Sequence, residues 1–215
     1  MNAIPSTEAL TVADIAARQP GATAVFRKHK IDFCCGGKIP LAEAAAGRGV
    51  PLAQIEAELA ALASPANDAS AQNLATDDLI ALIENRYHAT HRREIPELIR
   101  LARRVEAVHR DKADTPHGLA DLLETLGREM ESHMAKEEAI LFPMMRDGGH
   151  PMIGHPIAVM RHEHDDHGEN LRAIAELTHN GNPPDGACNT WRALYAGIRK
   201  LTDDLMEHIH LENNV

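Results

Sequence analysis

Two copies of the spacing His-x3-Glu stand out as candidates for chemistry: His133 with Glu137, and His208 with Glu212. In each copy the pair takes the next two places on a line of apolar residues spaced three and four apart, and the first line continues to Ile140. This spacing puts side chains on one face of a helix, so both pairs are predicted to face a core. Because buried charge is costly unless it is paired or bound to a metal, the pattern indicates a metal site.

A single histidine precedes each pair on another apolar face. His88 comes 45 residues before His133, and His164 comes 44 residues before His208, so the two halves of the segment repeat each other. Two equivalent ligand sets suit two metal ions, with carboxylates bridging them and imidazoles capping each one. Nitrogen and carboxylate ligands without thiolate favour iron or manganese, and zinc stays an alternative on affinity alone. We predict two iron ions held by six residues: His88, His133, Glu137, His164, His208 and Glu212.

Histidine is unusually common, with 14 copies against six Phe, Trp and Tyr residues. His91, one turn from His88, is expected to line the site. Glu138 is expected outside the ligand set, because it is rotated about 100° from Glu137 around the helix. The other histidines on these helices are expected to face solvent or the rim of the bundle: His162, His167 and His210.

Four long segments with helical periodicity must position these residues, at roughly 76–110, 117–145, 156–178 and 187–212. Connections containing Gly and Pro separate them, which is typical of an up-down bundle, and no segment alternates like a strand. Upstream, short helical stretches broken by Gly and Pro indicate a small helical module. The predicted fold is all-α, with a helical domain at 1–65, a linker at 66–75 and a four-helix bundle at 76–215.

Cys34 and Cys35 lie in the glycine-rich stretch DFCCGGK. Neighbouring cysteines can bridge only through a strained ring, so reduced thiols are expected. The glycines allow a sharp turn that leaves the sulfurs accessible, and Lys38 would favour thiolate. From the residues alone, a buried pair of small side chains capping a helix is an equally good interpretation. Cys188 is expected to be passive.

Composition excludes several classes of function. The net charge of -10, from 32 acidic and 22 basic residues, argues against nucleic acid as a partner. No apolar run approaches the ~20 residues needed to cross a bilayer, and the N-terminus lacks the pattern of a signal peptide. The sequence therefore predicts a globular protein of the cytoplasm with no membrane partner.

Short stretches along the whole chain carry a family resemblance: DFCCGGK at 32–38, RYH at 86–88, SHMAKEE at 132–138, LFP at 141–143, HD at 164–165, DDLMEH at 203–208 and LENN at 211–214. Together they resemble the iron–sulfur cluster repair di-iron proteins, the repair-of-iron-centres or YtfE/ScdA type. The first stretch is similar to the signature of the family's N-terminal ScdA-like domain. The others are similar to the two halves of its hemerythrin-like bundle.

The resemblance implies a protein of the nitrosative and oxidative stress response that repairs damaged iron–sulfur clusters by iron delivery, nitric oxide removal or both. It implies a carboxylate- and oxo-bridged di-iron centre on the six residues predicted above. Cys34 and Cys35 would act in iron or electron transfer or in contact with partners. The expected partners are damaged iron–sulfur proteins and nitric oxide or dioxygen. Nitric oxide reductase activity and a homodimer through the N-terminal module stay open.

A hemerythrin-type protein that binds or senses oxygen or nitric oxide is the alternative function. The cysteine pair argues against it, as does the count of four histidines on the apolar stripes where a hemerythrin typically uses five. The chain departs from the family pattern at its end, because Val215 precedes the place where a second Leu-Phe-Pro would stand. Glu212 is therefore expected to lie where a helix frays.

Overall fold

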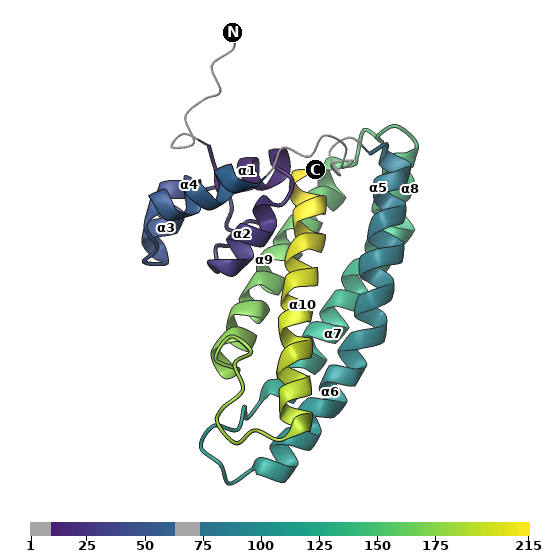
Figure 1. The fold of residues 1–215 in the computed structure, drawn as a ribbon. Coiled ribbons are helices and arrows are strands. Elements are labelled where there is room, and N and C mark those ends of the chain that lie inside the picture. The colour runs from purple at the N-terminus through teal and green to yellow at the C-terminus, as the bar shows by residue number, and fades with distance from the viewer. Residues whose placement is uncertain (1–9, 63–73) are drawn as a thin grey trace. The chain divides into compact units, whose positions relative to one another are not determined.

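The structure is a computed structural model that describes residues 10–62 and 74–215. Its contacts divide the chain into two compact units: Met1–Ala75 with Met206–Val215, and Thr76–Leu205. Throughout the described ranges the regular elements are helices, and the one isolated bridge pairs Thr11 with Pro40 (Figure 1). The predicted all-α class is confirmed. Most of the predicted linker at 66–75 lies outside the described residues.

The first unit contains four short helices and the last turns of α10. Thr11 caps α1 with a reciprocal capping box, in which its side chain accepts from the Asp14 backbone and the Asp14 side chain accepts from the Thr11 backbone. Pro40 and Pro51 precede α3 and α4, where a missing backbone donor costs nothing. The helices are α1 Val12–Arg18, α2 Ala22–Lys28, α3 Leu41–Gly47 and α4 Leu52–Ala61.

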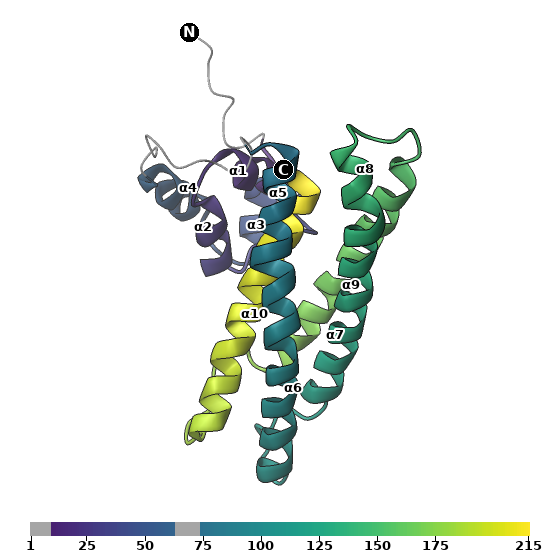
Figure 2. The ribbon, with the colours of Figure 1, turned by 90° about the vertical axis from the view of Figure 1, so that its right-hand side faces the viewer.

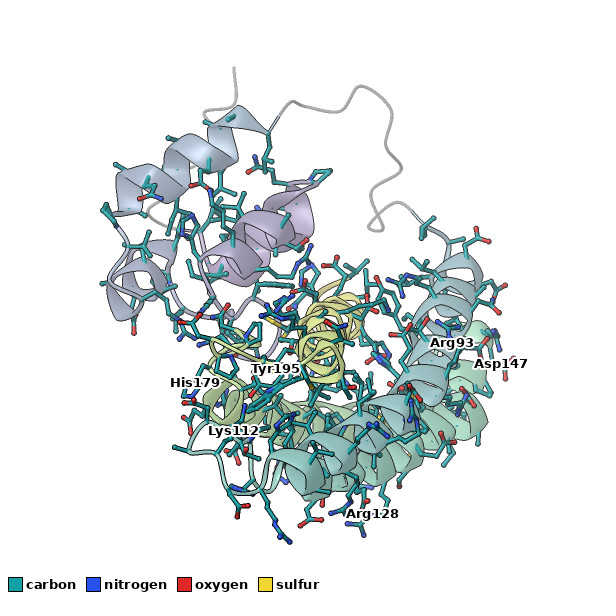
Figure 3. All side chains as sticks on the ribbon, turned by 60° about the horizontal axis from the view of Figure 1, so that its bottom comes forward. Arg93, Lys112, Arg128, Asp147, His179 and Tyr195 are labelled. Carbon is teal, nitrogen blue, oxygen red and sulfur yellow. The ribbon has the colours of Figure 1, made fainter. Side chains whose placement is uncertain are left out.

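The second unit is the helical bundle. Figures 1 and 2 show α6, α7, α9 and α10 running side by side, and α10 continues beyond this unit to Asn214. In the view of Figure 3, Tyr195 points to the bundle interior, whereas Arg93 and Arg128 project outward. The elements are α5 Thr76–Leu82, η3 Ile83–His88, α6 Ala89–His109, α7 Leu119–Lys136, η4 Glu137–Leu141, α8 Phe142–Arg146, α9 Gly154–Leu177 and α10 Asn189–Asn214.

Two glycines let α6 pack closely against its neighbours. A Cβ atom at Gly127 of α7 would lie 3.0 Å from Ile95 Cγ2, and one at Gly197 of α10 would lie 2.5 Å from Leu98 Cδ2. A side chain at either position would require the facing aliphatic side chain to shift, slightly at Gly127 and more at Gly197. The α6 helix therefore approaches α7 and α10 closely at these two positions.

Two π-helical segments interrupt the bundle helices, and periodicity did not predict them. The segment η4 runs from Glu137 to Leu141, just before Pro143. Proline removes a backbone donor and crowds the carbonyl four residues earlier, which favours a wider turn here. The wider turn shifts the buried face by one residue, so that Leu141 and Phe142 are buried and Ile140 is 49% exposed. The predicted inward position of Ile140 is wrong for this reason.

Candidate metal centre

Four of the six predicted ligands meet inside the bundle unit. His88 ends η3, His133 lies on the last turn of α7, Glu137 begins η4, and His164 lies on α9. All four side chains are at most 1% exposed.

Glu137 lies between the imidazoles. Its Oε2 is 3.4 Å from His88 Nε2, and its Oε1 is 3.4 Å from His133 Nε2. His164 Nε2 lies 3.1 Å from His133 Nε2. Ligand atoms of His133, Glu137 and His164 fall within 4.8 Å of one another, and His88 and Glu137 also belong to a common group of this kind. Clusters of histidine and glutamate able to hold metal are thus present.

The surroundings of the Glu137 carboxylate fit a metal site. Neither carboxylate oxygen is exposed, and neither accepts a hydrogen bond from any residue that the structure describes. Burying a carboxylate without donors is expensive, and coordination to a cation removes that cost. One oxygen faces each of two imidazoles, which is the arrangement of a carboxylate that bridges two metal ions. The chemistry of the site therefore fits a pair of cations.

Carboxylates outside the cluster orient two of the histidines. His88 Nδ1 lies 2.7 Å from Glu138 Oε1, and His133 Nδ1 lies 2.9 Å from Glu163 Oε2. An ionised carboxylate only accepts, so each Nδ1 carries the proton and each Nε2 keeps its lone pair for a metal.

Basic neighbours keep these two carboxylates ionised. Hydrogen bonds from Arg92 and His88 lower the pKa of Glu138. For Glu163, burial acts to raise the pKa, but the hydrogen bonds of Lys136 and His133 outweigh it and the pKa is lowered. Sequence reasoning missed both orienting roles, because the contacts join different helices and leave no spacing pattern within one.

His208 and Glu212 lie in the other compact unit, on the last two turns of α10. His208 is buried, Glu212 is only partly so, and His208 Nε2 is 2.8 Å from Glu212 Oε1. The expected fraying is not observed, since α10 stays helical through Asn214 and the Glu212 side chain is only 7% exposed. The i, i+4 pair presents nitrogen and oxygen on one helix face, as the spacing predicted.

Two histidines expected at the surface are buried instead. His167 is 1% exposed and packs edge-on to His133, with ring centroids 5.1 Å apart. His210 is 2% exposed because its ring packs edge-on to Phe33 at 5.5 Å, and burial lowers its pKa. His91, which was expected to line the site, is buried and lines a groove of about 580 Å³ between α6 and α7. His162 is exposed, as predicted.

Cys34 and Cys35 are reduced thiols whose Sγ atoms lie 3.6 Å apart. The Asp32 carboxylate accepts from both of their backbone amides, at 3.1 and 3.0 Å, and lies 3.3 Å from Cys34 Sγ. At Gly37 a Cβ atom would lie 2.6 Å from the Phe33 carbonyl oxygen, so the turn requires glycine. Ligand atoms of Asp32, Cys34 and Cys35 lie within 4.8 Å of one another, which makes a second group able to hold a metal.

Of the two interpretations that the sequence leaves open, an accessible thiolate and a buried small side chain, Cys34 fits the second. Its side chain is buried, and the Cys35 hydrogen bond, burial and the Asp32 charge raise its pKa well above the usual value. Cys35 is half-buried. Cys188 is exposed, with its Sγ 3.3 Å from His109 Nε2.

Comparison with known proteins connects this geometry to a family. Residues 78–215 match the hemerythrin HHE cation binding domain, and residues 8–63 match a domain of unknown function, ScdA_N. The iron–sulfur cluster repair protein YtfE of Pectobacterium carotovorum is 50% identical over 206 residues, covering 95% of this chain and 93% of that protein. The protein of the same name from Dickeya chrysanthemi is 48% identical, with the same coverage. This chain belongs to the YtfE family.

The YtfE family assignment bears on the ligand pair of α10. The hemerythrin match extends to residue 215, so the family domain includes His208 and Glu212 together with the four predicted ligands of the bundle unit. Membership also implies iron binding, which agrees with the histidine and glutamate clusters. Among the described helices, none is both long and apolar enough to cross a bilayer.

Proposed function

We propose that this chain repairs iron–sulfur clusters damaged by nitrosative or oxidative stress, using a di-iron centre with carboxylate and oxo bridges. The six ligands are His88, His133, Glu137, His164, His208 and Glu212. The observation that carries the proposal is Glu137, a buried carboxylate that faces one imidazole with each oxygen and accepts no hydrogen bond from the described residues. Relatives with about 50% sequence identity are named iron–sulfur cluster repair proteins, and this supports cluster repair as the function.

When bound, the two irons would supply one-electron chemistry and positions for small ligands such as nitric oxide or dioxygen. The chain's own residues hold and orient them. Glu137 and Glu212 are the bridging candidates, because each follows a ligand histidine by one turn. Glu138 and Glu163 keep the protons of His88 and His133 on Nδ1. The absence of thiolate from this set suits a centre that takes up and releases iron.

Two routes to repair fit this centre: iron delivery to a damaged client, and nitric oxide removal. Reduction of two nitric oxide molecules to nitrous oxide and water consumes two electrons and two protons, so that route needs a reduced centre and an external electron donor. Iron delivery requires only that the ligand residues release an iron ion to the client. We place both in the cytoplasm, with damaged iron–sulfur proteins as partners and neither nucleic acid nor membrane.

A client assay tests the proposal. An iron–sulfur enzyme inactivated by nitric oxide is incubated with the anaerobically reduced protein, and recovery of its activity is followed. Recovery should be lost when His133 and Glu137 are both replaced by Ala and should persist in Glu124→Ala, a matched change at an exposed position of α7. Full recovery with the double variant would refute the role of the centre. Nitrous oxide measured in the same vessel separates the two routes.

We further propose that Cys34 and Cys35 hold iron briefly during transfer to a client, and that the metal displaces the proton that burial otherwise keeps on Cys34. Two thiolates bound to one tetrahedral metal at about 2.3 Å each lie somewhat under 4 Å apart, and the two sulfurs here are separated by 3.6 Å. Asp32 supplies a third donor. Replacing both cysteines by Ser should slow client repair while the di-iron absorption is unchanged, and Cys188→Ser is the control. Equal repair rates in all three proteins would refute a thiol role.

A gas-binding or sensing protein is the second candidate, favoured by the hemerythrin match over 78–215. Reversible binding of dioxygen or nitric oxide with no effect on the damaged client would support this candidate over repair. The cysteine pair has no task in such a protein. A homodimer through the N-terminal module is compatible with either function, and sedimentation of the full chain would test it.

A further inference from the structure

Two successive residues of one helical segment lie close to the two ring nitrogens of His88. Its ring is fully buried, with Nε2 3.4 Å from Glu137 Oε2 and Nδ1 2.7 Å from Glu138 Oε1. Successive residues of a helix point about 100° apart, so one carboxylate reaches the inner nitrogen and the next reaches the outer one. The wide turn η4 begins at Glu137, at the place where this double contact is made.

Arg92 holds Glu138 in place. Its Nη1 donates to Glu138 Oε1 at 2.7 Å and its Nη2 donates to Glu138 Oε2 at 3.1 Å, so the contact with the carboxylate is bidentate. The same guanidinium donates from Nε to Glu131 Oε2 at 2.9 Å, so it is anchored from a second side. Arg92 lies one turn after His88 on the continuous helical stretch η3–α6, and Glu131 and Glu138 lie on the stretch α7–η4. Arg92 and His88 thus contact the same carboxylate, that of Glu138.

We propose that Glu138 is a positioning residue that fixes the tautomer and ring orientation of His88 at the metal centre, with Arg92 setting the place of Glu138. This inference rests on the proposed di-iron function. Neither residue touches the metal. An ionised acceptor at Nδ1 leaves the lone pair on Nε2 and makes the imidazole a stronger donor to the metal. A neutral acceptor at this place keeps the ring orientation but strengthens the imidazole less. Removing the acceptor loses both the orientation and the strengthening.

The test compares matched variants of the full chain. Glu138→Gln keeps an acceptor without charge, Glu138→Ala removes the acceptor, and Glu131→Gln alters the other partner of Arg92 without touching His88. Ferrous iron is titrated anaerobically into each metal-free protein, and the reduction potential and optical spectrum of the loaded centre are recorded. We expect Glu138→Ala to weaken iron binding about 10- to 100-fold, with Glu138→Gln intermediate. The potential should rise in the same order, and Glu131→Gln should match the wild type within about threefold.

The outcomes separate this inference from the proposed function. A wild-type protein that binds no iron would refute the di-iron proposal, and this inference with it. A wild-type protein that binds two irons, with Glu138 variants equal to it in affinity, potential and spectrum, would overturn only the role of Glu138. Equal losses in Glu138→Gln and Glu131→Gln would also overturn it, because the effect would then come from Arg92 and the helix contact. Circular dichroism of the metal-free variants checks that each is folded.

Discussion

Replacing Glu137 by Gln should have opposite effects on stability in the metal-free and the iron-loaded protein. In the metal-free state the substitution removes a carboxylate that is 1% exposed and has no hydrogen-bond donor among the described residues. An unsatisfied buried amide costs about 1–3 kcal/mol, whereas a buried ion without donors costs several. We expect a gain of about 1–3 kcal/mol, which raises Tm by roughly 2–10 °C in a chain of this size.

In the iron-loaded state the same substitution removes a bridging ligand. A metal present at about a thousand times its dissociation constant stabilises the folded state by about 4 kcal/mol, and a variant that binds it poorly loses that amount. The iron-loaded variant should therefore melt below the iron-loaded wild type, although the metal-free variant melts above the metal-free wild type. Calorimetry at pH 8, with and without ferrous iron under anaerobic conditions, measures both differences. Glu124→Gln is the control and should change neither by more than a degree or two. A Glu137→Gln variant that is destabilised equally with and without iron would refute the reasoning, because Glu137 would then act in packing alone.

Two further predictions concern packing and acid stability. Gly197→Ala should lower the free energy of unfolding by about 1–3 kcal/mol, because its Cβ would lie 2.5 Å from Leu98 Cδ2. Gly154→Ala, with open space around the new atom, should be neutral or gain up to about 1 kcal/mol, and equal effects in thermal unfolding would contradict the close approach. Burial acts to raise the pKa of Asp204, but hydrogen bonds from neighbouring basic side chains outweigh it and leave the pKa below 3.8. A carboxyl group whose pKa is lowered in the folded state stabilises the fold at pH values above its unfolded-state pKa, near 4, and this contribution is lost as the pH falls. Asp204→Asn should therefore reduce the stability that the protein loses between pH 7 and pH 3. If urea unfolding shows the same loss in the variant and the wild type, the ion pair does not contribute in this way.

Much of the fold could be predicted because the bundle helices obey one simple period. The apolar stripe of α10 continues into His208 and Glu212. The Glu212 side chain is 7% exposed, and the other members are buried: Trp191, Leu194, Ile198, Leu201, Leu205 and His208. The internal repeat supplied a second constraint, since matching spacings in two halves are hard to explain by surface positions. Ligand candidates were therefore accessible from the sequence wherever a polar residue replaced an apolar one on a regular helix.

The sequence could not reveal features that depend on irregular backbone or on contacts between helices. The wide turn η4 shifts the buried face, which is why Ile140 is exposed although the period predicts it inside. The pairing of Glu138 with His88 needs the relative rotation of two helices, which no single-helix pattern contains. His167 was expected at the rim, yet it packs edge-on against His133. The error at Ile140 comes from the irregular backbone of η4, whereas the error at His167 comes from a contact between regular helices.

The end of α10 links the two chemical groups of the chain. Residues three and four apart lie on one helix face, so His208 and Glu212 share a face, and the residues that contact the N-terminal helices point away from it. Because the helix is held from that other side, its last turns stay helical where an unsupported end would fray. The loop that carries Cys34 thus contacts the same turns of α10 that carry His208 and Glu212. The contacts are Arg27 with Glu207 at 2.7 Å, Phe33 with His210 at 5.5 Å between ring centroids, and the Cys34 carbonyl with Asn213 Nδ2 at 3.4 Å.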